Sequence, residues 1–387
     1  MPNIPQKYVC GAIPPHILTR VAEHTSNEAS GTARATLEHM RELATGRAAS
    51  LLQRPTAVAA TAVSTRKRRN VYTANHTLRL PGKLVLSEHK ARGTDVEVNE
   101  AYDGSGSTYD FFAVVFRRSS IDGRGMRLDS TVHYGESFEN ALWNGRQMVY
   151  GHADGRIFSR FTASVDVIAH ELTHGVTQFA AALGYHGQTG ALNEHLSDAF
   201  GIMVKQWLLG QTADKSNWLI GAEIFGPAVN GVAVRSMAAP GTAYDDPVIG
   251  KDPQPSHMHD YVETTEDNGG VHINSGILNH AFYRAAIALG GNTWDVLGRI
   301  WYVALTDRLR PEADFADFVQ ATVDIAGELF GMGGKVQRIV AEAWSGVGLF
   351  VLHTGCPTQH IPIKKPKQRV TAVVAARTLP SRRRPAR

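Results

Sequence analysis

The chain has 387 residues, of which 43% are hydrophobic and 20% are charged. This is the composition of an ordinary globular protein, and it excludes a wholly disordered chain. No apolar run is long enough to span a membrane, and the start of the sequence lacks the basic and apolar regions of a secretory signal. Only two cysteines, Cys10 and Cys356, are present, so a disulfide framework is excluded.

The net charge of +4 hides opposite charges in different parts of the chain. Residues 1–69 carry 10 basic and 4 acidic residues, and residues 355–387 carry 9 basic and no acidic residues. Residues 70–354 therefore carry a net charge of −11. Because the basic residues lie near the two ends, overall basicity is no argument for nucleic-acid binding. We expect neither a nucleic acid nor a membrane as a partner.

The first part of the chain predicts helices, a linker and then strands. Helical patterns cover residues 16–24 and 33–44, and residues 45–69 predict a linker that ends in a cluster of basic residues. From residue 71 to about residue 149, short alternating apolar runs separated by Gly and Asp predict strands. One helix is expected within that region, around residues 100–117.

After Ser164 the apolar pattern changes to the period of a helix. A long loop rich in Pro, Asp, Gly and His separates the second of these helices from the third, at residues 235–274, and such loops are often functional. The basic tail after Gly355 predicts no regular structure. The expected helices cover residues 164–182, 193–209, 275–289, 292–307, 312–330 and 333–345.

The chemistry centres on the segment from His170 to His174, which reads His-Glu-Leu-Thr-His. On a helix the two histidines lie on one face, so both imidazoles can bind one cation. Glu171 is adjacent to the first ligand and can reach a metal-bound water. This short pattern also occurs by chance in core helices, so it needs supporting context.

Glu194 and Asp198 supply that context. A catalytic zinc requires a third protein ligand and an open position, and Glu194 follows His174 by a gap that suits a turn and a second helix. Asp198 lies four residues after Glu194, on the same face, where it can fix the tautomer of a ligand histidine. The alternative is an exposed acidic face, which the surrounding apolar residues disfavour.

Together these segments resemble the thermolysin family of zinc metallopeptidases, and within it the protealysin-like branch with a short propeptide. The resemblance covers about residues 70–350 in the expected order. The matching stretches are Asn140 to Gly145, His170 to His174, Gly190 to Asp198, Arg235 to Met237, and Asp267 to Gly276.

The resemblance implies catalytic roles for particular residues. One zinc ion would be bound by His170, His174 and Glu194. Glu171 would act as general base towards zinc-bound water and then as acid towards the leaving amine. The remaining roles are the oxyanion donors Tyr185 and His272, the orienting residue Asp267, and the partners of the zinc ligands, Asn193 and Asp198.

The resemblance also implies how an extended peptide or protein substrate binds. Asn140 and Ala141 would pair with its backbone, and Arg235 would bind a substrate carbonyl. An apolar pocket would receive the residue after the cut bond, so cleavage is expected on the amino side of bulky hydrophobic residues. The pocket residues would be Phe158, Phe161, Val167, Ile220, Ile224 and Val234.

The implied fold class is α+β, with two lobes and the active-site helix between them. Residues 70–180 would form a β-rich N-terminal lobe that includes the zinc-binding helix, and residues 181–354 a mainly α-helical C-terminal lobe. Residues 1–69 would be propeptide and linker. Residues 355–387 would be a basic, disordered tail.

The sequence departs from the family where many members bind two calcium ions. The matching positions are Lys205, Asn217, Leu219 and Ala222, while Asp166 remains. Calcium requires six to eight oxygen ligands, so we expect no double calcium site. Lys205 is expected to replace the charge of the ion by pairing with Asp166 or with Glu223.

The N-terminal segment, which reads Pro14-Pro15-His16-Ile17-Leu18, resembles the propeptide of protealysin-like precursors. Residues 1 to about 45 are expected to cover the cleft and act as an intramolecular inhibitor. Cleavage within about residues 45–70 would release them, either at apolar residues or at the basic cluster 66–69. Cys10 is expected to be a small buried cysteine, and a thiolate that reaches zinc in the latent form is the alternative.

Two further questions stay open in the sequence. The first is the function: the alternative to a peptidase is a metal-stabilised, peptidase-like binding protein that uses its basic tail to dock on an acidic partner. Without a visible signal peptide the expected location is the cytoplasm, or outside the cell by a non-standard route.

Overall fold

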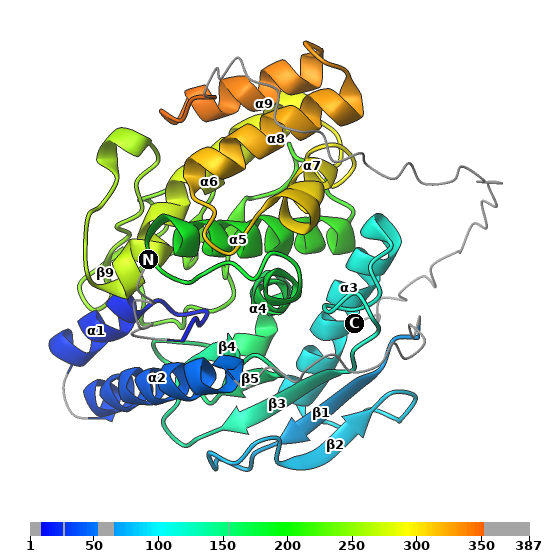
Figure 1. Ribbon diagram of the computed structural model, residues 1–387. Coiled ribbons are helices and arrows are strands. Elements are labelled where there is room, and N and C mark those ends of the chain that lie inside the picture. Colours follow the sequence, from blue (N-terminus) through cyan, green and yellow to red (C-terminus); the bar gives the residue numbers. More distant parts are fainter. Residues whose placement is uncertain (1–8, 26–27, 53–65, 154, 352–387) are drawn as a thin grey trace, which may run out of the picture. The chain divides into compact units, whose positions relative to one another are not determined.

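The structure is a computed structural model that describes residues 9–25, 28–52, 66–153 and 155–351. The chain divides into two units, residues 1–352 and residues 353–387, and every described residue lies in the first. Within this first unit a five-stranded sheet is followed along the chain by a group of helices (Figure 1). The predictions for residues 53–65 and for the basic tail lie outside the described residues.

Two helices precede the sheet, α1 (Pro15–His24) and α2 (Glu28–Leu52). Pro15 occupies the first turn of α1, where proline fits because its missing N–H would have no helical partner. The helix expected over residues 33–44 is longer than predicted. It continues through Leu52 because residues 45–52 contain helix formers and no proline occurs before Pro55.

The five-stranded sheet has the order β2-β1-β3-β5-β4 and is mixed. The central pairs β1–β3 and β3–β5 are parallel, and the two outer pairs are antiparallel. Helix α3 (Val96–Phe116) contacts β1, β2 and β3 and buries Phe111 and Phe112. Because β4 stands at one end of the strand order, it is an edge strand. The strands are β1 (Arg69–Thr73), β2 (Lys83–Ser87), β3 (Leu128–Tyr134), β4 (Ala141–Trp143) and β5 (Met148–Gly151).

The helical part begins with a short 3-10 turn, η1 (Phe161–Ala163), and α4 (Val165–Phe179). Figure 1 shows α4 near the centre, with the sheet below it and α5 (Gly187–Leu209) beside it. The later helices contact α5 or one another and enclose an aromatic core. They are α6 (Asp267–Leu289), α7 (Leu297–Val303), a π-helical turn (Ala304–Arg308), α8 (Phe315–Phe330) and α9 (Lys335–Ser345).

The long segment between α5 and α6 contains short paired strands rather than one uniform loop. Strand β6 (Leu219–Ile220) pairs with β7 (Arg235–Ser236), and β8 (Asp245–Asp246) pairs with β9 (Gly250–Lys251). A 3-10 turn, η2 (Met258–Asp260), follows. Helix α6 begins eight residues earlier than expected, because a turn at residues 268–270 with positive φ angles merges with it.

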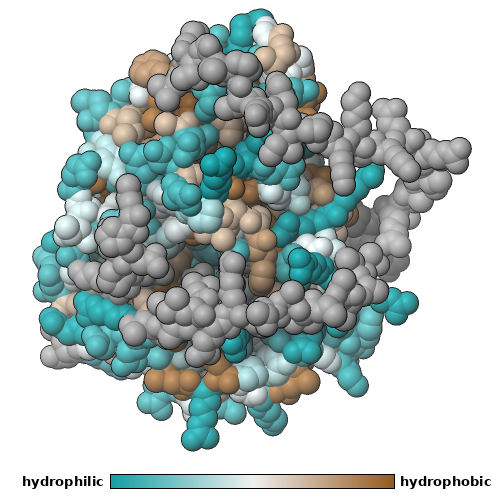
Figure 2. Space-filling model, in the orientation of Figure 1, coloured by the Kyte–Doolittle hydropathy of each residue, from teal (hydrophilic) through white to brown (hydrophobic). Residues whose placement is uncertain are grey.

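Hydrophilic residues predominate on the face drawn in Figure 2, and apolar residues occur there in separate groups. Among the described residues, no helix is both long and apolar enough to cross a membrane.

Candidate zinc site

Helix α4 presents His170 and His174 one turn apart, both buried. Their Nε2 atoms are 3.1 Å apart. The helix can be buried this completely because its other faces carry Ile168, Leu172 and Val176, which pack in the core. The predicted shared helix face is confirmed.

Glu194 reaches the same point from α5. Its carboxylate oxygens lie 3.4 Å from Nε2 of His170 and 3.4 Å from Nε2 of His174. Ligand atoms bound tetrahedrally at 2.0–2.1 Å to one zinc would be about 3.3 Å apart. Oε2 of Glu194 is buried and accepts no hydrogen bond from the described residues, as expected for an oxygen that faces a cation. These three residues therefore fit a zinc ion.

The charge of Glu194 is maintained despite its burial. Burial alone would raise the pKa of its carboxyl group. The neighbouring histidines His272, His174 and His170 outweigh this effect and hold the pKa well below its ordinary value. The site therefore offers an anionic oxygen to the metal.

The second nitrogen of each ligand histidine has an oxygen partner. Nδ1 of His170 lies 2.8 Å from Oδ1 of Asp198, and Nδ1 of His174 lies 2.9 Å from Oδ1 of Asn193. Arg235 binds Asp198 with two nitrogens, at 2.9 and 2.8 Å. These contacts direct the Nε2 atoms of both histidines towards the metal position.

Sequence reasoning missed the support behind Asp198. The indole N–H of Trp301 donates to Nε2 of His195 at 2.8 Å, so Nδ1 of His195 carries the proton and donates to Oδ1 of Asn279, also at 2.8 Å. Asn279 in turn donates to Oδ2 of Asp198 at 2.8 Å. The sequence alone assigns His195 no role. Its position beside Glu194 was visible in the sequence, but its partners lie 84 and 106 residues away.

Glu171 points to the same region from α4. Its Oε2 accepts a hydrogen bond from the backbone N–H of Trp143 at 3.0 Å, while Oε1 is buried without a hydrogen bond from the described residues. Burial raises the pKa of Glu171 to about 7, against the opposing charge of His170. A carboxyl group with such a pKa can both accept and donate a proton near neutral pH.

Tyr185 and His272 lie next to each other and close to the carboxylate of Glu194. The hydroxyl of Tyr185 lies 3.2 Å from Nε2 of His272 and donates to Oε1 of Glu194 at 2.5 Å. Asp267 holds His272 twice, through the backbone N–H at 2.8 Å and through Nδ1 at 2.6 Å. Burial opposes protonation of His272, but the charges of Asp267 and Glu194 outweigh it and raise its pKa.

A strained turn makes the double contact of Asp267 possible. Asp267 and Asn268 have φ angles of 51°, and Gly269 and Gly270 have φ angles of 86° and 73°. A side chain at Gly269 would meet the backbone of Gly187 at 2.9 Å. Positive φ angles at residues other than glycine are costly and cluster at functional sites.

The N-terminal segment lies directly on this site. The backbone N–H of Ala12 donates to the carbonyl of Ala141 at 2.9 Å. Ile13 exchanges two hydrogen bonds with the side chain of Asn140, at 2.8 and 2.9 Å. The edge of β4 that was predicted to pair with substrate is thus occupied by residues of the chain itself.

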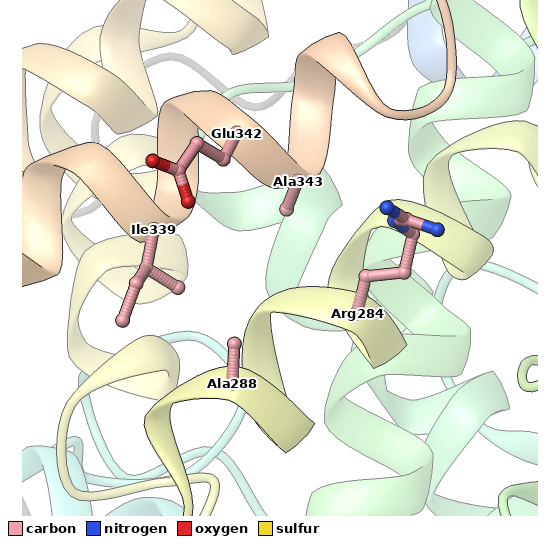
Figure 3. Close-up of a pocket in the computed structure, with 5 residues that line it drawn as sticks. All are labelled: Arg284, Ala288, Ile339, Glu342 and Ala343. Carbon is pink, nitrogen blue, oxygen red and sulfur yellow. The ribbon is translucent and has the colours of Figure 1, made fainter.

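The apolar residues predicted to line the substrate pocket are all buried in one hydrophobic cluster. Ile220 pairs with Arg235 across β6 and β7, and the rings of Phe158 and Phe161 are 6.1 Å apart. A separate pocket of about 120 Å³ lies between α6 and α9 (Figure 3). It is too small for a peptide. Its lining residues are Arg284, Ala288, Ile339, Glu342 and Ala343, and none of them is a predicted site residue.

Lys205 pairs with both carboxylates that the sequence had offered as alternatives. Its Nζ lies 2.9 Å from Oδ2 of Asp166 and 3.8 Å from Oε1 of Glu223. Lys205 and Asp166 are buried. The ion pair joins α5 to the first turn of α4.

Comparison with known proteins identifies the family. Residues 47–178 match the model of the thermolysin metallopeptidase catalytic domain, and residues 181–349 match that of its α-helical domain. The extracellular metalloprotease of Pectobacterium carotovorum subsp. carotovorum is 48% identical over 344 residues, which is 89% of this chain and 97% of that protein. The chain belongs to the thermolysin family of metallopeptidases.

Other relatives agree with this assignment. The solved precursor of protealysin from Serratia proteamaculans has a TM-score of 0.80 and 48% identity, covering 88% of this chain and 100% of that one. A thermolysin from Bacillus sp. strain EA1 is 38% identical over 72% of this chain and 50% of its own length. This thermolysin-family protein is therefore a zinc metalloendopeptidase with the expected α+β fold, and His170, His174 and Glu194 form a zinc site consistent with the family.

Proposed function

We propose that this metallopeptidase is made as a zymogen and that the mature enzyme cuts on the amino side of bulky hydrophobic residues. The pairing of residues 12–13 with the edge of β4 carries the proposal. An extended peptide binds a sheet edge through its backbone, so a segment that already occupies the edge excludes substrate. The N-terminal segment then acts as an intramolecular inhibitor until it is cut off.

The geometry around the three ligands supports the catalytic roles that we propose. Bound zinc would lower the pKa of a water molecule to about 7 and polarise the scissile carbonyl. Oε1 of Glu171 accepts the proton of the attacking water, while Trp143 holds Oε2 in place. Tyr185 and His272 supply donors for the oxyanion, and one such donor is typically worth about 2.7–4 kcal/mol. Glu171 then delivers its proton to the leaving amine.

Substrate recognition is expected to use Arg235 and the apolar residues beside it. Two nitrogens of Arg235 bind Asp198, whereas its buried Nη1 has no hydrogen-bond partner among the described residues. This nitrogen can donate to a substrate carbonyl. Phe158, Val167, Ile220 and Val234, together with Phe161 and Ile224, offer an apolar surface for the side chain that follows the cut bond.

Peptide cleavage by the mature enzyme tests the specificity. Peptides that differ only in the residue after the scissile bond would be compared, with Leu or Phe against Asp at that position. Burial of a Leu or Phe side chain is worth about 1.5–3 kcal/mol, which corresponds to about 10–150-fold in kcat/KM. Equal rates for Leu and Asp would refute the proposed specificity.

Maturation is proposed to occur before Lys67. Lys67 pairs with Asp110 at 2.5 Å, Arg68 donates to the carbonyl of Gly125, and buried Arg69 pairs with Glu88. A protease acting at residues 67–69 would have to detach these contacts, which disfavours the basic cluster as the cleavage site. Mass spectrometry of the mature N-terminus would test this, and a first residue after Lys67 would contradict it.

Three further predictions belong to the same proposal. We expect no calcium at the family's double site, because Lys205 supplies a cation there.

The basic tail is expected to be dispensable for catalysis, so deletion of residues 355–387 should leave peptidase activity intact. If the tail instead docks on an acidic partner, the same deletion should abolish that binding. The description of the Pectobacterium relative as extracellular favours a location outside the cell.

A further inference from the structure

Cys10 lies inside the metal site rather than in an apolar core. Its Sγ is 2.9 Å from Nε2 of His174 and donates to Oε1 of Glu194 at 3.0 Å. Ligand atoms of Cys10, His170, His174 and Glu194 all lie within 4.8 Å of one another, and all four residues are buried. A cysteine placed only for packing would have apolar neighbours, whereas this sulfur faces three zinc ligands.

The backbone on both sides of Cys10 fixes this position. The N–H of Val9 donates to the carbonyl of Met40 in α2 at 3.2 Å, and the N–H of Ala12 donates to Ala141 in β4 at 2.9 Å. Gly11 lies so close to Asn140 that a Cβ atom would be 2.8 Å from its Nδ2. The sulfur is therefore presented from a tightly held segment, and Gly11 permits the approach.

The ligand count leaves one place for the sulfur. Catalytic zinc sites have three protein ligands and an open fourth position, and cysteine thiolate is one of the preferred zinc ligands. Oε2 of Glu194 and Oε1 of Glu171 are buried beside the site without hydrogen bonds from the described residues, as expected next to a bound cation. The four side chains together supply the number and types of ligand that a closed zinc site uses.

We propose that the Cys10 thiolate is the fourth zinc ligand of the precursor and keeps the enzyme latent by occupying the open position. This inference rests on the proposed zymogen function and specifies how the latency is achieved. When the metal binds, the sulfur–hydrogen bond breaks, the proton leaves to solvent and the sulfur–metal bond forms. Removal of the N-terminal segment takes the sulfur away and opens the position to water and substrate.

Cobalt substitution tests the ligand directly. The full-length precursor carrying Glu171→Ala, which cannot process itself, would be stripped of metal and loaded with Co²⁺. Thiolate ligation gives a charge-transfer absorption in the near ultraviolet. We expect this band in the parent and in the matched control Cys356→Ser, and its loss in Cys10→Ser and Cys10→Ala, while the visible cobalt bands persist. The same near-ultraviolet spectrum in all four proteins would overturn the proposal.

The rate of maturation provides a second readout in the active chain. Cys10→Ser should shorten the time needed for self-processing, because the open zinc position is no longer blocked. Cys356→Ser should mature at the wild-type rate. The mature enzymes from wild type and Cys10→Ser should be equally active, because Cys10 leaves with the propeptide. Unchanged maturation of Cys10→Ser would contradict the proposal.

The proposed function and the thiolate ligand can fail separately. If the wild-type precursor binds one zinc and becomes active on cleavage, but Cys10→Ser behaves like wild type in both experiments, only the ligand assignment is wrong. If the parent binds neither zinc nor cobalt, the metallopeptidase mechanism itself is wrong, and the thiolate ligand is overturned with it.

Discussion

At the scale of single residues, the ligand histidines depend on groups that never touch the metal. Asp198 binds His170 and is itself held by Arg235 and Asn279. His195 fixes the amide orientation of Asn279, because the indole N–H of Trp301 leaves only Nδ1 of His195 able to donate. Burial lowers the pKa of His195 to about 4, so it stays neutral in this chain of hydrogen bonds.

We therefore predict that His195 is a positioning residue for the zinc site. His195→Leu should remove the restraint on Asn279 and lower zinc affinity by about 10–100-fold, the range typical for partners of metal ligands. Competition with a chelator of known affinity would measure this. His280→Leu is the control, since His280 follows Asn279 on α6 but stacks on Tyr283. Equal zinc affinities of the two variants would refute the role.

At the scale of elements, the relation between α4 and α5 determines where the ligands meet. Lys205 of α5 and Asp166 of α4 form a buried ion pair at 2.9 Å. Asp166 also accepts a hydrogen bond from the N–H of Val167 and contacts the hydroxyl of Ser164. Loss of one partner would leave an uncompensated buried charge, which is far more costly than loss of an exposed pair.

Lys205→Met should accordingly lower the free energy of unfolding by about 3–5 kcal/mol. Lys215→Met is the matched control, because Lys215 pairs with Asp214 on an exposed part of the surface. The control should change stability by only about 0–1 kcal/mol. Denaturant titration of both variants would measure the difference. Similar losses in the two proteins would show that the Lys205 pair is not important for stability.

Docking of α1 is predicted to depend on pH through His16. Nε2 of His16 lies 2.9 Å from the hydroxyl of Tyr244, while Nδ1 has no hydrogen-bond partner among the described residues. Burial lowers the pKa of His16 from 6.5 to about 4; Asp267 opposes this shift, and His272 and Arg235 add to it. Protonation therefore favours the undocked segment. Docking should be full above pH 6.5 and weaken as the pH falls towards 4, by about 1–3 kcal/mol.

Hydrogen exchange of residues 9–25 in the Glu171→Ala precursor would test this across the same pH range. His16→Leu should reduce the acid-induced increase in exchange. His24→Gln should retain it, because His24 lies at the exposed end of the same helix. Identical pH dependence in both variants would assign the effect to other groups.

At the scale of the whole molecule, local patterns predicted much of the fold and the site. The helix period around His170 and His174 and the spacing to Glu194 indicated a shared metal position, and the structure brings these three side chains together. Contacts between distant segments were not predictable. The bonds of His195 to Asn279 and Trp301 depend on how α5, α6 and α7 pack, and no local pattern carries that information.

The contact of Cys10 with the site illustrates the same limit. A cysteine in a short helical segment is compatible with a core position, and only the packing of residues 9–13 on β4 brings its sulfur beside Glu194. The start of β1 at Arg69 was equally hidden, because the pairing of Arg69 with Glu88 turns one residue of a basic cluster into part of a strand.

The central claim is that Glu171 performs chemistry at a zinc ion held by its neighbours. The most direct measurement is the zinc content of purified wild type and Glu171→Ala, together with cleavage of a peptide that carries a central Phe or Leu. We predict one zinc per chain in both proteins, with cleavage by processed wild type and none by the variant. Cleavage by Glu171→Ala, or processed wild type that binds zinc without cleaving, would contradict the account.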